Sequence, residues 1–166
     1  MSLQFFTASC TDDTSASLFG LCDDKTNQRA YIATETQSNW IAIVENPNQH
    51  EVKFIGIDNC VPIFRANGEI ESRCDGLLLY NDNLIFVELK ERDIPPAKWV
   101  KKGYEQLKTT ILLFKQENDL SKYKSLKAYL VNSMRPNVPI TQINKIQQFY
   151  TETSILLYIQ QLIRLD

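Results

Sequence analysis

The sequence has few of the residue patterns on which several common enzyme classes depend. Its 166 residues include a single histidine, His50, so mechanisms that need two imidazoles are excluded, zinc hydrolysis at an H-E-x-x-H motif among them. The five glycines are too widely separated to form a G-x-G-x-x-G or Walker loop, which excludes a glycine-rich phosphate cradle. No two of the four cysteines have C-x-x-C spacing, which argues against a zinc knuckle or a thioredoxin-like site.

Long hydrophobic runs are also absent. No stretch approaches the roughly 18 apolar residues of a membrane span, and the first residues lack the basic and apolar regions of a secretory signal. We therefore expect a cytoplasmic protein that has no membrane partner and keeps its cysteines reduced, with Cys74 a small buried hydrophobe. Cys60 and Cys74 lie on neighbouring segments and are able to approach each other, but we expect no disulfide between them. The sequence leaves open whether the chain forms a homodimer.

The chain as a whole has no excess of basic residues. Its 18 Lys and Arg against 20 Asp and Glu give a net charge of −2, which by itself argues against a protein that coats nucleic acid. The charges are unevenly distributed, however, because residues 1–89 hold 5 basic and 13 acidic residues, whereas residues 90–166 hold 13 basic and 7 acidic ones. Phosphate contacts are local and are screened beyond about 10 Å, so the basic half remains able to bind nucleic acid weakly and in a salt-sensitive way.

The length and the hydrophobic fraction of 43% fit one α/β domain that spans residues 1–166. The hydrophobic pattern predicts a series of strands followed by a helix, a strand and further helix. The expected elements are a helix over 11–22, strands over 29–35, 40–45 and 51–58, a loop or hairpin over 62–72, a hairpin over 73–90, a helix after Pro95-Pro96, a strand over 127–132, and one or two helices between 141 and 165.

The predicted hairpin over residues 73–90 carries the candidate chemistry. It is apolar on both faces, as expected of strands in the middle of a layered domain, yet Asp75, Glu88 and Lys90 interrupt it at one end. An even loop, either Asp82-Asn83 or the four residues 81–84, places Asp75 opposite Lys90 with Glu88 on the neighbouring diagonal. The three side chains then project from one face, whereas an odd loop turns Asp75 to the other face.

Asp75, the twelve residues after it and Glu88-Leu89-Lys90 resemble the D…(D/E)-x-K signature of the PD-(D/E)XK nuclease superfamily. The stretch over about residues 52–115, with its segments IDNC, RCDGLLL, FVELK and GYEQLKTTI, is similar to small bacterial members of that superfamily. The resemblance implies a restriction-endonuclease-like fold, with a mixed central sheet flanked by helices, and metal-dependent hydrolysis of phosphodiester bonds in DNA, with RNA the less favoured substrate. It implies that Asp75 and Glu88, with the Leu89 carbonyl, bind Mg²⁺ or Mn²⁺ and that Lys90 is the catalytic lysine.

The sequence departs from the family pattern at several positions. Cys74 stands where the motif has proline, and Gln106 with Thr110 is only half of the Q-x-x-x-Y motif that some relatives carry, so Gln106 is a candidate near the metal site. The family often has an upstream glutamate ligand, and the candidates by position are Glu51, Glu69 and Glu71.

Two interpretations of the motif residues stay open. One is a structural ion-pair network at the end of a sheet, and the other is a site. Retention of a site does not prove turnover, so the alternative to a nuclease is a non-catalytic interaction or nucleic-acid-binding protein that keeps the nuclease fold.

The helix after Pro96 carries a second set of candidates. Its lysines form either a solvated face or contacts to phosphates, and Lys101 and Lys102 are our candidates for substrate binding, with Lys98 and Lys108 beside them. We expect its aromatic residues to pack in the core rather than stack on bases, and His50 to lie at a solvated turn. The aromatic residues are Trp99, Tyr104 and Phe114.

Overall fold

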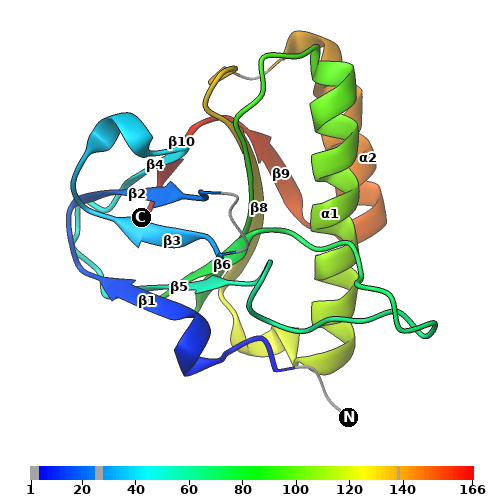
Figure 1. Ribbon diagram of the computed structural model, residues 1–166, viewed down its shortest axis with the longest axis horizontal. Helices are drawn as coiled ribbons and strands as arrows, with labels where there is room; N and C mark the ends of the chain where they lie inside the picture. Colours follow the sequence, from blue (N-terminus) through cyan, green and yellow to red (C-terminus); the bar gives the residue numbers. More distant parts are fainter. Residues whose placement is uncertain (1–3, 25–27, 138) are drawn as a thin grey trace.

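The computed structural model describes residues 4–24, 28–137 and 139–166, which form three layers (Figure 1). A six-stranded sheet lies in the middle. Helices α1 (Pro96–Glu117) and α2 (Ile143–Thr153) cover one of its faces, and a four-stranded sheet covers the other. The predicted α/β class is therefore confirmed, but helices flank the central sheet on one face only, because the N-terminal segment forms strands in place of the expected helix.

The central sheet is antiparallel from β1 to β7 and parallel from β7 to β9. α1 connects β7 to β8 and α2 connects β8 to β9, so a helical crossover leads to each parallel neighbour. The strands, in spatial order, are β1 (Thr11–Thr14), β5 (Val52–Gly56), β6 (Gly76–Tyr80), β7 (Asn83–Lys90), β8 (Ser125–Asn132) and β9 (Leu156–Ile159).

The second sheet is also mixed, with one parallel pair, β10 and β4. In spatial order its strands are β10 (Leu162–Arg164), β4 (Ala42–Glu45), β2 (Leu18–Cys22) and β3 (Tyr31–Ala33). Single 3₁₀ turns complete the described elements at Ala8–Cys10, Gln37–Asn39, Leu120–Lys122 and Ile140–Gln142.

The β6–β7 hairpin turns through two residues, Asn81 and Asp82, whose φ angles are 43° and 63°. Both positive values are typical of a type I′ turn, which Asn and Asp tolerate. Gly76 pairs with Val87, so the next position along puts Asp75 across from Glu88. The prediction that Asp75 lies opposite Lys90 is wrong, because the two-residue loop is Asn81-Asp82 rather than Asp82-Asn83. The loop is nevertheless even, so all three residues keep the predicted common face.

Apolar side chains on both faces of β6 and β7 contribute to two cores. Leu77 and Phe86 pack under the helices, while Leu78 and Val87 pack between the two sheets. This is the division predicted from alternation, since successive residues of a strand point to opposite faces. The hairpin is thus covered on both sides, and a charged residue within it lies in a buried environment.

α1 packs closely on the central sheet. Its predicted apolar stripe is buried, and Trp99, Tyr104 and Phe114 belong to that core, as expected. Gly103 permits the close approach, because a Cβ there would lie 2.3 Å from Cδ1 of Leu130 on β8. Polar side chains of α1 are therefore close enough to reach the end of β7.

The helix predicted over 11–22 is wrong, because this segment forms β1 and β2. Thr11 and Asp12 had suggested a helix N-cap, but such residues also suit strands and turns when tertiary partners satisfy them. Asp12 accepts hydrogen bonds from the Arg29 guanidinium and from the backbone N–H of Ile32. Gly20 of β2 packs directly against the Trp40 ring. A Cβ at this position would lie 2.0 Å from Cγ of Trp40, so the contact requires a residue without a side chain.

The prediction of helix to residue 165 is also wrong beyond α2. Ser154 has a left-handed φ of 62° and ends the helix by donating its N–H to the Tyr150 carbonyl. The apolar run that follows pairs with β8 as β9, which buries Leu157 and Ile159 in the helix-side core. Pairing with β8 therefore makes this short apolar segment a strand, although its pattern alone is also compatible with a helix.

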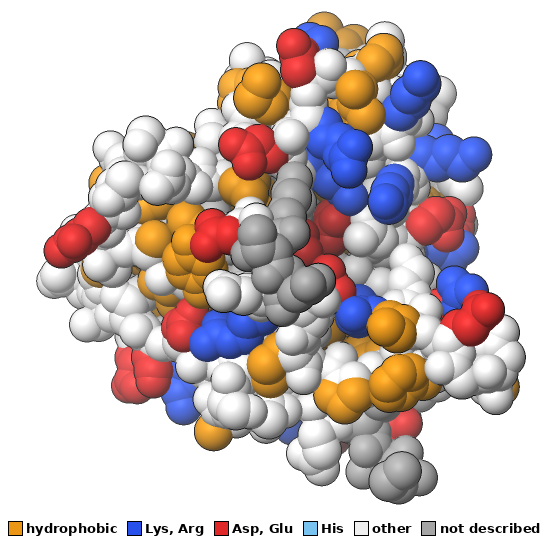
Figure 2. Space-filling view, in the orientation of Figure 1, with side chains coloured by type: hydrophobic (Ala, Val, Ile, Leu, Met, Phe, Trp, Pro, Cys, Tyr) orange, Lys and Arg blue, Asp and Glu red, His pale blue; other side chains and the backbone are white. Residues whose placement is uncertain are grey.

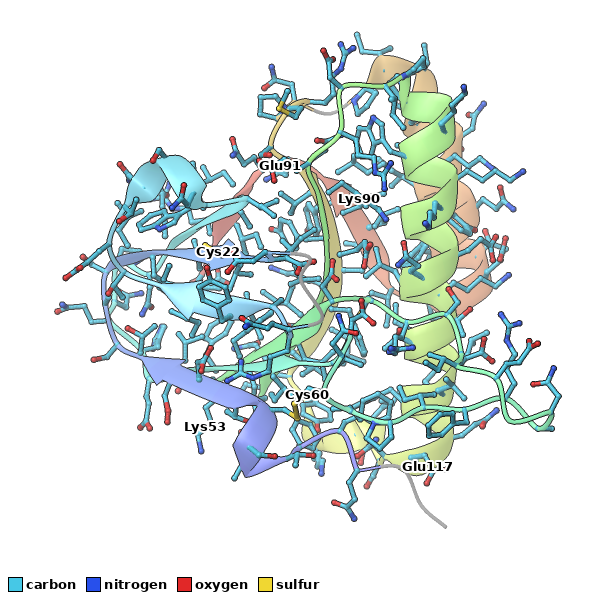
Figure 3. The ribbon with its side chains drawn as sticks, viewed as in Figure 1. Cys22, Lys53, Cys60, Lys90, Glu91 and Glu117 are labelled. Carbon is cyan, nitrogen blue, oxygen red and sulfur yellow. A yellow bond between two sulfur atoms is a disulfide. The ribbon has the colours of Figure 1, made fainter. Side chains whose placement is uncertain are left out.

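The expectation that all cysteines are reduced is wrong, because Cys10 and Cys60 form a disulfide (Figure 3). Cys60 is therefore not a partner of Cys74, which is a free, buried cysteine under α1, as predicted. The sequence gives no sign of this pair, since the two residues are 50 positions apart and meet only when β1 pairs with β5. Neither described helix has the combination of length and apolar character that a membrane crossing requires.

Candidate functional site

The open end of the β6–β7 hairpin brings Asp75 and Glu88 together. The Asp75 backbone N–H donates to Oε1 of Glu88 over 3.1 Å, and the Leu89 backbone N–H donates to Oδ2 of Asp75 over 2.7 Å. Gly76 holds the strand near its neighbour, because a Cβ there would lie 2.3 Å from the Phe54 ring. Adjacent strands thus hold two carboxyl groups side by side.

Lys90 occupies the next position on the same face of β7 and reaches toward α1 (Figure 3). Its Nζ lies 2.8 Å from Oε2 of Glu88 and donates to Oε1 of Gln106 over 2.7 Å. Gln106 in turn donates its Nε2–H to the Arg73 carbonyl over 3.3 Å. The structure therefore brings Asp75, Glu88, Lys90 and Gln106 into one cluster, whose members come from the residue before β6, from β7 and from α1.

This cluster is almost fully buried. Asp75, Glu88 and Lys90 are 5%, 2% and 7% exposed. Burial and the nearby Glu88 carboxylate raise the pKa of Asp75 well above its usual range. Burial also raises the pKa of Glu88, although the Lys90 ammonium opposes this effect. One lysine charge thus faces two carboxyl groups, an arrangement that favours a further cation or a retained proton.

Two more carboxylates influence the pair, and neither is part of the motif. Asp58, just after β5, raises the pKa of Glu88 through its charge, and Asp23, just after β2, acts in the same way on Asp75. Asp58 forms an ion pair of 2.8 Å with Arg73. The available signal is an acidic residue within two positions of the end of an apolar strand in each case, but only the sheet pairing brings these strand ends together.

The three upstream glutamates named from the sequence lie apart from the cluster. Glu51 lines a shallow pocket with Asn81 at the turn end of the hairpin, opposite the site. Glu69 and Glu71 both pair with Arg65 in the loop that precedes β6. None of these glutamates has a described contact with Asp75 or Glu88, so an upstream glutamate ligand stays a prediction.

The support for the cluster comes from α1 by way of Thr110. Its hydroxyl accepts from the Cys74 N–H over 2.8 Å and donates to the Gln106 carbonyl over 2.9 Å. Thr110 is fully buried, and its helical position follows one turn after Gln106. This residue, noted in the sequence only for replacing a tyrosine, holds the segment that leads into Asp75.

The lysines of α1 differ in their surroundings. Lys and Arg side chains gather over its N-terminal turns, at the upper right of the view (Figure 2). Lys101 and Lys102 are both exposed, but Lys102 lines a cavity with Lys90 and Lys101 does not. Lys108 is engaged by Glu152. His50 lies near the hairpin turn, where Asn81 contacts its Nδ1 at 2.8 Å, consistent with the predicted position at a turn.

Within the described ranges, no three His, Cys, Asp or Glu side chains converge as a metal centre. The donor set is therefore the carboxylate pair of Asp75 and Glu88, with the Leu89 carbonyl beside it in β7. Mg²⁺ is commonly bound through one or two carboxylates, with water completing its shell, so the residues fit such an ion. The chain matches no protein-family model, no curated protein and no solved structure.

Proposed function

We propose that the protein is a metal-dependent nuclease that hydrolyses phosphodiester bonds in DNA, and that the fold around its site is restriction-endonuclease-like. One observation carries the proposal: Asp75, Glu88 and Lys90, which are spaced as in the nuclease signature, form one buried cluster on one sheet face. Buried ion pairs are a poor way to stabilise a fold, because apolar residues of similar size do so at least as well. A functional role explains why charges occupy this position.

The proposed metal ligands are Asp75, Glu88 and the Leu89 carbonyl. All three are oxygen donors, which hard cations such as Mg²⁺ and Mn²⁺ prefer. Bound there, the metal supplies positive charge to the phosphate and lowers the pKa of a water molecule. The carboxylates are already fixed by backbone N–H donors, so metal binding requires little rearrangement of the strands.

Lys90 is the proposed catalytic lysine. An ammonium group has three N–H donors, and here two of them are directed to Glu88 and Gln106. The third is available to a water molecule or to a phosphate oxygen. Held in this way, Nζ orients the attacking water or stabilises negative charge that develops on the phosphate.

Gln106 is the proposed positioning residue for Lys90. Its amide accepts from Nζ on one side and donates to the Arg73 carbonyl on the other, so its own orientation is set by two partners. A lysine side chain has four rotatable bonds, and holding it in one geometry reduces the entropy that is lost during the reaction.

The second candidate function is a non-catalytic protein that binds nucleic acid or another partner. The observation that favours it is the low exposure of all three motif residues, together with the direct neutralisation of Glu88 by Lys90. In that case the cluster holds the hairpin to α1 and binds no ion.

The disulfide bears on the cellular location. Disulfides persist in oxidising compartments and are rare in a reducing cytoplasm, so the Cys10–Cys60 bond disagrees with the cytoplasmic location predicted from the sequence. Alkylation of the protein in freshly lysed cells, followed by mass measurement, distinguishes the reduced from the oxidised pair.

Cleavage of supercoiled plasmid and of branched DNA in the presence of Mg²⁺ or Mn²⁺ tests the nuclease proposal, with excess RNA as competitor to identify the preferred substrate. We expect Asp75→Asn and Lys90→Met to lower the cleavage rate by at least about 100-fold. The matched control is Glu105→Gln on α1, because Glu105 is exposed and forms no hydrogen bond or ion pair in the described part of the chain. Wild-type rates in both site variants would contradict the proposal.

Calorimetric titration with Ca²⁺ separates the two candidate functions. The nuclease proposal expects binding to the wild-type protein that is lost in Asp75→Asn. A protein that neither binds the ion nor cleaves DNA supports the non-catalytic alternative.

A further inference from the structure

A small cavity adjoins Lys90 at the junction of β7 and α1. Its volume is about 220 Å³, and it lies between the segment that leaves β7 and the first turns of the helix. This is below the roughly 300–1,000 Å³ of pockets that enclose drug-sized ligands, so it suits a small group rather than a whole nucleoside. Its lining consists of Lys90, Arg92, Ile94, Lys98, Trp99 and Lys102.

Four of these six residues are cationic, and no carboxylate is among the described lining residues. Arg92, Lys98 and Lys102 form no ion pair within the part of the chain that the structure describes, although acidic residues are plentiful elsewhere. Like charges gathered around a cavity repel one another, and an anion relieves that repulsion.

Trp99 provides a second, independent observation. Its side chain is 2% exposed and forms part of the cavity wall, and its indole N–H is buried without an acceptor among the described residues. A buried donor that lacks an acceptor is energetically unfavourable, and an acceptor supplied by a ligand removes this penalty. The other tryptophan, Trp40, has an acceptor, because its Nε1 donates to the Glu35 carbonyl over 3.1 Å.

The start of α1 adds to the positive field. Its first turn contains no acidic residue, and no side chain caps the helix N-terminus. The helix dipole is therefore uncompensated at the end that borders the cavity. The positive end of the helix dipole favours anions such as phosphate, in agreement with the lysines nearby.

We propose that this cavity binds one phosphodiester group of the DNA strand, next to the group that reacts at the carboxylate pair. The choice of DNA as the ligand rests on the proposed function, whereas the affinity for a phosphate group does not. Lys98, Lys102 and Arg92 supply the charge, and the Trp99 indole N–H supplies a directed hydrogen bond. Lys90 borders both the cavity and the carboxylate pair, so it lies between two successive phosphates of one strand.

The experiment is a titration of the ¹⁵N-labelled full chain, in EDTA and at constant ionic strength, followed by the two indole N–H cross-peaks in ¹H–¹⁵N spectra. Inorganic phosphate replaces chloride as the first probe. We expect a saturable shift of the Trp99 peak and none of the Trp40 peak, which serves as an internal control. The Trp99 peak is assigned with Trp99→Phe.

Lysine variants identify the cavity as the origin of the shift. Lys98→Gln and Lys102→Gln are expected to weaken the apparent affinity by about tenfold each, since each removes a charge that faces the anion. Lys101→Gln is the matched control, because Lys101 is exposed on the same helix but does not line the cavity. An equal loss of phosphate affinity in all three variants would indicate general electrostatic attraction and would overturn the assignment of the phosphate site to this cavity.

Two further probes identify the source of the phosphate. A dinucleotide has one internal phosphodiester and no terminal phosphate, whereas a nucleoside monophosphate has only a terminal one. A shift with the dinucleotide supports the proposal, and a shift only with the monophosphate and inorganic phosphate would overturn the phosphodiester assignment. No shift with any probe, in a protein that cleaves DNA, would overturn the cavity proposal alone. A shift without cleavage would instead contradict the nuclease proposal and leave the phosphate site standing.

Discussion

Asp75 and Glu88 face each other across the β6–β7 hairpin, with the Asp75 N–H donating to Oε1 of Glu88 over 3.1 Å and Lys90 as the cation that contacts Glu88. Ionisation of both buried carboxyl groups is energetically unfavourable, since like charges at close range repel strongly where water is excluded. The stability of the protein and the chemistry of the site therefore oppose each other at these residues.

Replacing Asp75 by asparagine is expected to stabilise the metal-free protein by about 1 kcal/mol at neutral pH. The variant removes one charge of the buried pair, and its amide is able to donate to the Glu88 carboxylate. Urea unfolding in EDTA measures the change. Asp93→Asn is the control, because Asp93 forms an exposed pair with Arg135 and its loss is expected to matter little. A lower free energy of unfolding in Asp75→Asn would contradict the interpretation that the two carboxyl groups repel each other in the folded protein.

The gain in Asp75→Asn is expected to depend on pH. The folded pKa of Asp75 is raised, so its carboxyl favours the folded state below the unfolded pKa near 3.9 and loses this contribution as the pH rises through the folded value. The free energy of unfolding of the variant should therefore exceed that of the wild type at neutral pH and approach it below about pH 4. Unfolding curves across this range measure the difference, and a gain that grows toward acid pH would have the wrong sign.

Lys90→Met is expected to lower the free energy of unfolding by about 3 kcal/mol, because it leaves Glu88 buried without its cation. The double variant Lys90→Met/Glu88→Gln should recover part of this loss, since the uncompensated charge is then gone. A double-mutant cycle measures the coupling. Strictly additive effects would show that the two side chains do not interact in solution.

Under the nuclease proposal, Gln106→Met is expected to reduce DNA cleavage about tenfold while leaving Ca²⁺ binding unchanged. The substitution removes the acceptor of Lys90 but touches neither carboxylate, so it disturbs only the position of Nζ. Gln116→Met, at an exposed position of the same helix, is the control. If Gln106→Met also abolished ion binding, its role would be in holding the site together rather than in orienting Lys90.

Reduction of the Cys10–Cys60 disulfide is expected to cost up to about 4 kcal/mol of stability, because the bond closes a loop of 50 residues in the unfolded chain. Urea unfolding with and without reductant measures the loss. The variant Cys10→Ser/Cys60→Ser should be as unstable as the reduced protein and insensitive to reductant, since Cys22 and Cys74 are free. Identical curves for the oxidised and reduced wild type would contradict this expectation.

Local patterns were enough to predict the elements around the candidate site. The apolar alternation of β6 and β7, the polar turn between them and the helical stripe after Pro96 all have short-range causes, and the structure has these elements near the predicted positions. The common face of Asp75, Glu88 and Lys90 followed from parity alone. Which residues of β6 and β7 pair with each other could not be predicted, because the pairing depends on which two residues adopt the type I′ turn.

By itself, the sequence determined that two carboxylates and a lysine lie at one end of an apolar hairpin, because side-chain alternation in a strand needs no information from distant residues. Only the tertiary structure decided what surrounds them: Gln106 on the lysine, Asp58 and Asp23 near the carboxylates, and the basic cavity beside Lys90. Those neighbours come from segments far apart in the chain, and strand pairing and core packing bring them together. The same reason explains why the N-terminal segment forms strands and why Cys10 meets Cys60.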